Sequence, residues 1–264
     1  MIYTGATSPI ESPVPNASVP HLSLVVPVYN EGERLASSLD RLQQFRAGLE
    51  RSSELLLVDD CSEPRTTALL DDFARAIPGV TLLRNDENRG KGFSVSRGML
   101  AARGAFRVFT DADLAYPPGE VSKIVRDLEA GADVAIACRV LPESRYVMSP
   151  TFFSYLYTRH VMSRAYNALV RLVLIDGVLD TQAGLKGFTA RAAGLIFPRV
   201  SIPRFGFDVE ALFIARKHGL VIRQTAVDFR FDEEATTVKF AQDAVRMARD
   251  LVRIRENDRR GRYD

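Results

Sequence analysis

Two carboxylates stand where an apolar run ends. The run Val108-Phe109-Thr110 leads directly into Asp111-Ala112-Asp113. Such a run is typical of a buried strand, and alternate residues of a strand point the same way, so Asp111 and Asp113 should project together from its carboxyl end. Two adjacent acids repel each other unless they share a cation or a proton. A divalent metal, Mg²⁺ or Mn²⁺, that carries a phosphate-containing ligand would satisfy both.

A plainer interpretation of this acidic pair remains open. A solvated loop or the start of a helix also uses acids with this spacing, and a D-x-D match by itself has many false positives. Other polar loops must come to the same place before the spacing indicates a metal site.

The first half of the chain alternates strands with helices. Apolar runs predict strands at 22–28, 54–58, 80–84, 107–110 and 133–138, and helical periodicity predicts helices at 31–45, 66–77, 92–102 and 118–130. This alternation predicts an α/β fold with a parallel sheet. The carboxyl ends of parallel strands meet at one edge, where open α/β sheets bind ligands.

After about residue 140 the pattern changes. Residues 148–173 are rich in aromatic and basic side chains and predict one long or broken helix, and 180–188 predict a loop followed by an extended segment. Helices are expected at 190–197 and 208–218 and a strand at 220–231. Residues 239–255 predict a basic amphipathic helix.

Three further loops follow strand ends and should meet the acidic pair at this edge. Pro27-Val28-Tyr29-Asn30-Glu31 offers aromatic and polar groups for a base or ribose, and Asp59-Asp60-Cys61-Ser62 offers carboxylates for a nucleobase or ribose hydroxyl. Asn88-Arg89-Gly90-Lys91-Gly92 combines cations with glycines that let the backbone approach a ligand. Alone, each loop could be a sheet cap, a helix cap or a tight turn. Together they predict a nucleotide-diphosphate site with a metal.

Composition excludes several classes of protein. The chain has 264 residues, enough for one α/β domain, and its net charge of +2 gives no general case for nucleic acid binding. No segment approaches the roughly 20 apolar residues of a membrane span. Residues 1–20 lack a signal-peptide pattern and predict a flexible leader. Cys61 and Cys138 are expected to be reduced, as in a cytoplasmic protein.

The four loops occur in the order and spacing of the family 2 inverting glycosyltransferases, and the chain resembles that family over about residues 22–255. Two later stretches, Asp180 to Phe188 and Phe205 to Glu210, are similar to those of its polyprenyl-phosphate glycosyltransferases, which include the dolichyl-phosphate β-glucosyl and mannosyl enzymes. The resemblance implies a GT-A (Rossmann-like) fold, with a mostly parallel sheet flanked by helices and a helical acceptor-side region.

The implied reaction is metal-dependent transfer of a hexose from a nucleotide-diphosphate sugar to a polyprenyl phosphate. Glucose is the leading candidate for the hexose, and the donor would be UDP-glucose or GDP-mannose. The implied organisation is a leader at 1–21, one domain at 22–257 and a disordered tail at 258–264. Within the domain, 22–140 would bind the nucleotide sugar and 141–257 the acceptor.

The resemblance also assigns site residues. Asp111 and Asp113 would hold Mg²⁺ or Mn²⁺ and the donor diphosphate, and Lys91 belongs to the same donor site. The nucleoside pocket would be lined by Pro27, Tyr29, Glu31 and Asp60. The acceptor phosphate would be gripped by Arg139, Arg159 and Ser163, whose plainer role is surface charge on a solvated helix.

The acceptor decides whether a base is needed. A phosphate oxygen is already an anionic nucleophile, whereas a hydroxyl requires a general base, for which Asp208 is the first candidate and Glu210 the second. Either acid could instead hold a helix start or pair with Lys186. In both cases a metal would neutralise the charge that builds on the departing diphosphate. A single in-line displacement would invert the anomeric centre.

Some features leave the acceptor open. The stretch Asp113-Leu114-Ala115-Tyr116-Pro117 differs from the many mannosyl enzymes that have Gln after the second acid, and the hydrophobic anchors usual in the family are missing from the sequence. A soluble small-molecule acceptor is therefore an alternative, and a non-catalytic sugar-nucleotide-binding protein is a weaker one because both acids are present. Peripheral membrane contact could involve 239–255 and the aromatic residues of 148–157, unless both pack against the core. The oligomeric state stays undetermined.

Overall fold

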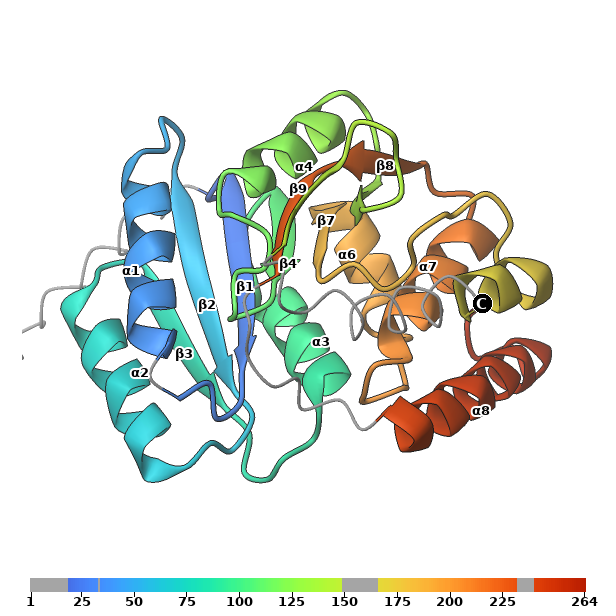
Figure 1. The fold of residues 1–264 in the computed structure, drawn as a ribbon, viewed down its shortest axis with the longest axis horizontal. Helices are drawn as coiled ribbons and strands as arrows, with labels where there is room; N and C mark the ends of the chain where they lie inside the picture. The colour runs from blue at the N-terminus through green and yellow to red at the C-terminus, as the bar shows by residue number, and fades with distance from the viewer. Residues whose placement is uncertain (1–18, 33, 149–165, 232–239) are drawn as a thin grey trace, which may run out of the picture.

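The computed structural model describes residues 19–32, 34–148, 166–231 and 240–264. They form a seven-stranded sheet of order β3-β2-β1-β4-β7-β5-β8 and a two-stranded sheet of β6 and β9. Figure 1 shows helices on both sides of the large sheet. The strands are β1 (Leu22–Val28), β2 (Ser53–Asp59), β3 (Val80–Arg84), β4 (Phe106–Thr110), β5 (Val134–Cys138), β6 (Arg145–Met148), β7 (Leu185–Thr189), β8 (Ile222–Ala226) and β9 (Asp228–Phe231).

The helices take their places between and after these strands. They are α1 (Arg34–Ala47), α2 (Pro64–Ala76), α3 (Lys91–Ala101), α4 (Glu120–Glu129), α6 (Ala190–Ile196), α7 (Phe207–Lys217) and α8 (Phe240–Arg259). Residues 166–173 are also helical. The predicted alternation over the first half is confirmed, with boundaries shifted by at most three residues.

Most of the large sheet is parallel, as predicted, and its one reversed strand has a consequence for function. β7 runs antiparallel to both β4 and β5, and its first residue, Leu185, lies opposite Thr110, the last residue of β4. Because of this reversal, the loop before β7 arrives at the same edge of the sheet as the loop after β4. The stretch Asp180 to Gly184 is thereby brought beside Asp111.

Alternation along β1 gives the sheet two buried faces. Leu24 and Val26 belong to the apolar cluster that includes α1 and α4, whereas Val25 belongs to the opposite cluster with α3, α6 and α7. A strand buried on both faces reads as a continuous apolar run, which is why 22–28 was recognisable. The result is a sheet between two helical layers.

The segment 220–231 was expected to be one strand, and this expectation is wrong. It forms β8 and β9, which pair in different sheets. The break falls at Val227, where the chain stops pairing with β5 and begins to pair with β6. The Val227 side chain is buried, its carbonyl accepts a hydrogen bond from Arg145 N, and its N–H donates to Ser144 Oγ. Continuous apolar character could not reveal the change of partner.

The helix expected at 148–173 is only partly tested, because residues 149–165 lie outside those described. Met148 was expected to be helical but is the last residue of β6. Residues 166–173 are helical, as expected. No helix in the described parts of the chain is long and apolar enough to span a membrane.

The tail expected to be disordered at 258–264 is ordered instead. α8 continues to Arg259, and the Tyr263 side chain is fully buried against the cluster around α7. On α8, Leu251 and Ile254 pack into the same cluster. The apolar face of the predicted amphipathic helix is therefore occupied by the protein core at these positions.

Candidate active site

The sheet opens where β1 and β4 part. Their pairing runs from Leu22 opposite Phe106 to Val25 opposite Phe109, and beyond it β1 pairs only with β2. Pro27 lies in this last part, where its missing N–H costs no hydrogen bond to β4. The strand order also reverses between β1 and β4, and such a switch point is where α/β sheets form ligand crevices.

Backbone strain gathers at this carboxyl edge. Among the described residues, the non-glycine residues with positive φ are Asn30 (52°), Cys61 (63°) and Leu114 (49°), and they follow β1, β2 and β4 respectively. A left-handed conformation is unfavourable for residues other than glycine, and observed cases cluster at functional sites. Strain in three loops at one edge marks that edge as the candidate site.

Hydrogen bonds tie the predicted loops together. Asn30 N donates to Ser62 Oγ over 3.1 Å, which joins the first two loops. Asp60 is buried, and its Oδ1 accepts hydrogen bonds from Asn85 Nδ2 (2.7 Å) and Arg89 N (2.9 Å), while Oδ2 accepts from Gly90 N (2.8 Å). The convergence predicted from the sequence is thus observed. In this structure Asp60 holds the third loop, a role that the sequence did not indicate.

The two glycines of the third loop lie against residues 202–207. A Cβ on Gly90 would lie 2.6 Å from Pro203 O, and one on Gly92 would lie 2.6 Å from Phe207 Cβ. Gly90 also has φ +92°. These glycines allow the start of α3 to pack against residues 202–207, and their role in ligand approach stays a prediction.

The acidic pair lies at the centre of the edge. Asp111 Oδ1 is 2.6 Å from Lys91 Nζ, at the first residue of α3. Asp113 Oδ1 accepts a hydrogen bond from Ala115 N (3.0 Å), and partial burial together with the charge of Asp111 raises the pKa of Asp113. A Cβ on Gly184 would lie 2.0 Å from Asp111 Oδ2, so only glycine leaves room for that carboxylate.

Glu31 adds a third negative group to this edge. Burial, and then the charges of Asp113 and Asp111, raise the pKa of Glu31 to about 7. The first loop therefore contributes to the acidic cluster as well as to the predicted nucleoside pocket. Tyr29 in the same loop is 47% exposed, which leaves its ring open to a planar ligand.

The residues at the edge fit a hard divalent cation. Asp111 and Asp113 offer oxygen ligands, and burial, followed by the neighbouring charge of Asp111, raises the pKa of Asp113. No group of three acidic, histidine or cysteine side chains in the described ranges could hold a metal. An ion bound here would therefore complete its shell with phosphate oxygens and water, as Mg²⁺ commonly does.

Asp208 is paired with a buried lysine. Its Oδ1 lies 2.5 Å from Lys186 Nζ, which also donates to Ala183 O over 2.6 Å, and both side chains are almost entirely buried. Burial raises the pKa of Asp208 and lowers that of Lys186, while each charge opposes the shift of the other. The salt-bridge alternative noted for Asp208 is the arrangement observed.

Glu210, the second candidate base, has a structural position. It is fully buried and accepts hydrogen bonds from Ser201 N (2.9 Å), Ser201 Oγ (2.7 Å), Ile202 N (2.8 Å) and Tyr263 Oη (2.6 Å). A carboxylate with these partners holds the 201–202 loop and the C-terminal segment against α7. The suggestion of Glu210 as a base is not supported by this placement.

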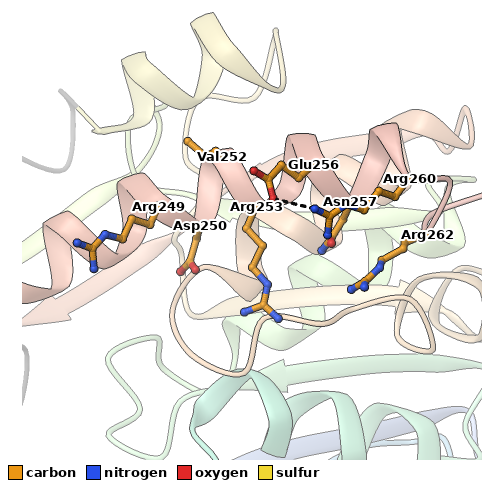
Figure 2. Close-up of a pocket in the computed structure, with 8 residues that line it drawn as sticks. All are labelled: Arg249, Asp250, Val252, Arg253, Glu256, Asn257, Arg260 and Arg262. Atoms are coloured by element: carbon orange, nitrogen blue, oxygen red, sulfur yellow. Dashed lines mark ion pairs between the residues drawn. The ribbon is translucent and has the colours of Figure 1, made fainter.

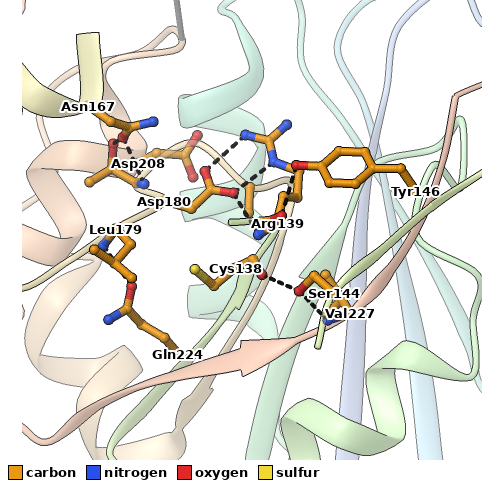
Figure 3. A network of polar contacts seen from close by, with 12 residues as sticks. Cys138, Arg139, Ser144, Tyr146, Asn167, Leu179, Asp180, Asp208, Gln224 and Val227 are labelled. Atoms are coloured by element: carbon orange, nitrogen blue, oxygen red, sulfur yellow. Dashed lines mark hydrogen bonds and ion pairs between the residues drawn. The ribbon is translucent and has the colours of Figure 1, made fainter. Parts of the chain in front are cut away.

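Arg139 is held by a carboxylate in this structure. Its Nε and Nη2 donate to Asp180 over 2.7 and 2.9 Å, and its backbone N donates to the same carboxylate (Figure 3). Burial alone would raise the pKa of Asp180, but Arg139 holds it below its usual value. The ion pair leaves Arg139 beside the edge with its charge balanced. Arg159 and Ser163, the other predicted phosphate contacts, lie outside the described residues.

Sequence reasoning missed several residues that shape the site. Gly184 and Asp180 were quoted only as parts of a motif, yet one makes room for Asp111 and the other fixes Arg139. The signal was the stretch 180–188 itself, whose position beside β4 depends on the reversal of β7. Both cysteines are free thiols, Cys61 exposed and Cys138 buried.

Comparison with curated proteins supports a specific group of relatives. "Dolichyl-phosphate beta-glucosyltransferase" of Dictyostelium discoideum is 34% identical over 245 residues, which cover 89% of this chain and 74% of the relative. The Homo sapiens protein of the same name is 30% identical over 247 residues, with coverages of 89% and 74%.

Solved structures show the same fold at lower identity. Glucosyl-3-phosphoglycerate synthase from Mycobacterium tuberculosis in complex with UDP has a TM-score of 0.65 and 19% identity, covering 89% of this chain and 80% of that one. Its complex with Mn²⁺, UDP-glucose and phosphoglyceric acid has a TM-score of 0.65 at 18% identity, with coverages of 89% and 79%. These similarities confirm the predicted GT-A, Rossmann-like architecture.

The family itself is identified by sequence. The family model "Glycosyl transferase family 2" matches residues 23–169, which include β1, the acidic pair and Arg139. This match spans more than half of the chain and agrees with relatives that are at least 30% identical. The chain is therefore a glycosyltransferase and belongs to glycosyl transferase family 2.

Proposed function

We propose that this chain transfers a hexose from a nucleotide-diphosphate sugar to a polyprenyl phosphate of the dolichyl type, with glucose as the leading candidate sugar. The transfer would invert the anomeric centre and use a divalent metal. The observation that carries the proposal is the acidic pair beside Lys91 at the β1/β4 switch point. The names of the relatives support both the sugar and the acceptor.

The donor would bind along the loops of this edge. Asp111 and Asp113 would hold Mg²⁺ or Mn²⁺, which supplies positive charge for the departing diphosphate. Lys91, 20% exposed at its side chain, lies close enough to share that diphosphate. Pro27, Tyr29, Glu31 and Asp60 would border the nucleoside.

The state of the candidate bases favours an anionic acceptor. Asp208 is bound to Lys186, and Glu210 accepts four hydrogen bonds from Ser201, Ile202 and Tyr263. Both carboxylates are thus engaged with groups of the protein itself in the free chain. A phosphate monoester needs no general base because its oxygen already carries negative charge.

Label transfer would test the acceptor. The protein, incubated with UDP-[¹⁴C]glucose, Mn²⁺ and polyprenyl phosphate, should move label into butanol-extractable lipid, and GDP-[¹⁴C]mannose serves as the competing donor. No label in the lipid with either donor would contradict the proposal. Label that instead appears on a phosphorylated water-soluble acceptor, supplied in a parallel reaction, would establish the soluble-acceptor alternative.

Peripheral membrane contact would be electrostatic on the side of α8. A cavity of about 610 Å³ is lined there by Arg249, Arg253, Arg260 and Arg262 with Asp250 and Glu256 among them. Figure 2 shows Asp250 and Arg253 projecting on the same side of the helix. Arginines near a surface attract anionic lipids. Co-sedimentation with phosphatidylserine vesicles but not with phosphatidylcholine vesicles would support this contact, and equal sedimentation with both would contradict it.

A further inference from the structure

Tyr116 carries a polar group that the fold leaves unpaired. It lies in the loop after the acidic pair and is 2% exposed. Its hydroxyl is buried and has no hydrogen-bond partner in the part of the chain that the structure describes. A buried hydroxyl without a partner is unfavourable, and most buried polar groups in proteins are paired with protein or water.

The Tyr116 ring and the Arg139 guanidinium both pack on the ring of Phe229. The Tyr116 ring meets the Phe229 ring edge-on at 5.1 Å, and the guanidinium of Arg139 lies 5.6 Å from the centre of the same Phe229 ring. The charged groups that act on the phenol are Arg139, Asp180, Asp111 and Asp113. Tyr116 thus follows Asp113 by three residues in the chain and shares the Phe229 ring with Arg139, which links it to both halves of the predicted phosphate-binding region.

The same loop carries a second unfavourable feature. Leu114, two residues before Tyr116, is buried with φ of 49°. Ala115 N donates to Asp113 Oδ1, and Ala115 O accepts from Arg230 N at 2.8 Å, so the strained turn is fixed on both sides of its backbone. Strain next to an unpaired polar group is typical of loops shaped for a ligand.

We propose that the Tyr116 hydroxyl donates a hydrogen bond to a phosphate oxygen of bound substrate. The inference rests on the proposed function and adds a substrate contact to it. An anionic oxygen is the matching partner for a hydroxyl donor, and a divalent cation held by Asp111 and Asp113 would bring a phosphate to this edge. The phosphate belongs either to the donor diphosphate or to the acceptor.

A pair of matched variants tests whether the hydroxyl is unpaired in the free protein. Tyr116→Phe removes only the hydroxyl, and its Tm should equal or exceed that of the wild type. Tyr146→Phe is the control because Tyr146 Oη donates to Arg139 O over 2.8 Å. Loss of that bond should lower Tm by roughly 2–4 °C. A similar fall in Tyr116→Phe would show an internal partner and overturn the proposal.

Calorimetry with two phosphate sources tests the contact itself. UDP with Mn²⁺ probes the donor, and farnesyl phosphate probes the acceptor. Tyr116→Phe should bind one of them about 10- to 100-fold more weakly, the range expected for a lost hydrogen bond to a charged group, while Tyr146→Phe binds both as the wild type does. The ligand whose affinity falls in Tyr116→Phe identifies the phosphate that the hydroxyl contacts. Unchanged affinity for both would overturn the contact.

Binding by the wild-type protein separates the proposed function from the role of Tyr116. If wild-type protein binds neither UDP with Mn²⁺ nor farnesyl phosphate, the proposed function fails. If the wild type binds them and Tyr116→Phe binds equally well, the proposed function stands and only the role of Tyr116 is wrong.

Discussion

A lysine with no exposed surface lies next to the acidic pair. Lys186 is paired with Asp208 and also donates a hydrogen bond to the carbonyl of Ala183. The sequence allowed this pairing for Asp208 but could not choose it over a catalytic base, because the distance depends on β7 and α7 meeting in space. By contrast, Asp111 and Asp113 were predictable, since their spacing on one strand is local.

The first prediction concerns this ion pair. Asp208→Asn should lower the free energy of unfolding by about 3–5 kcal/mol, because Lys186 would stay buried without its counter-charge. Urea denaturation would measure the change. The double variant Lys186→Met/Asp208→Asn should recover much of the loss, since the unpaired charge is gone.

The same double variant separates structure from catalysis. With a phosphate acceptor, the recovered fold should keep substantial transfer activity, as no base is required. Recovered stability with transfer abolished would instead assign Asp208 a direct part in the reaction.

At the scale of elements, Glu54 joins three segments of the chain. From β2 its buried carboxylate accepts from Ser23 Oγ of β1 (2.6 Å) and from Arg103 N and Nε after α3 (2.7 and 3.0 Å). Burial by itself would raise the pKa of Glu54, but these hydrogen bonds and the charge of Arg103 outweigh it and hold the pKa below 4.5.

The second prediction follows from the direction of that shift. A depressed folded pKa stabilises the protein above the unfolded value near 4.5, and the contribution is lost as the pH falls through the folded pKa. Glu54→Gln should therefore be less stable than the wild type by about 1.5–3 kcal/mol at pH 7. The difference should shrink below pH 4. Unfolding at pH 7, 5 and 3.5 would measure it, and a gap independent of pH would contradict the prediction.

Helices and strands with a clear periodic pattern could be predicted from the sequence. The parallel strands and their helices were recognisable because each is a continuous apolar run or a 3.6-residue repeat. The split of 220–231 and the direction of β7 were not, because both depend on which distant strand offers a partner. Gly90 and Gly92 show the same limit, since their close neighbours are about 110 residues further along the chain.

At the scale of the whole molecule, the C-terminal segment closes one side of the core. Tyr263 is buried beside Phe213, with ring centres 5.9 Å apart, and its hydroxyl donates to Glu210. Lys217 of α7 forms ion pairs with Asp258 and Asp264. The charged sequence 258–264 predicted disorder because a single tyrosine among polar residues gives no periodic signal.

The third prediction tests this closure. Tyr263→Ala should lower the free energy of unfolding by about 3–5 kcal/mol, the range for removing a large buried ring. Thermal and urea unfolding would measure the loss. Arg262→Ala is the neighbouring control, since exposed substitutions usually change stability by less than about 0.5 kcal/mol. Equal free energies of unfolding for the two variants would mean that the C-terminal segment does not pack against the core as described.

The central claim is that Asp111 and Asp113 hold a metal-bound nucleotide diphosphate at the β1/β4 edge. Calorimetric titration of UDP into wild-type protein and Asp113→Asn, each with and without Mn²⁺, tests it directly. Mn²⁺ should strengthen UDP binding by at least about 10-fold in the wild type, because it neutralises charge on the diphosphate, and should not do so in the folded variant. Binding that is equally tight without Mn²⁺, or an undiminished Mn²⁺ effect in Asp113→Asn, would contradict it.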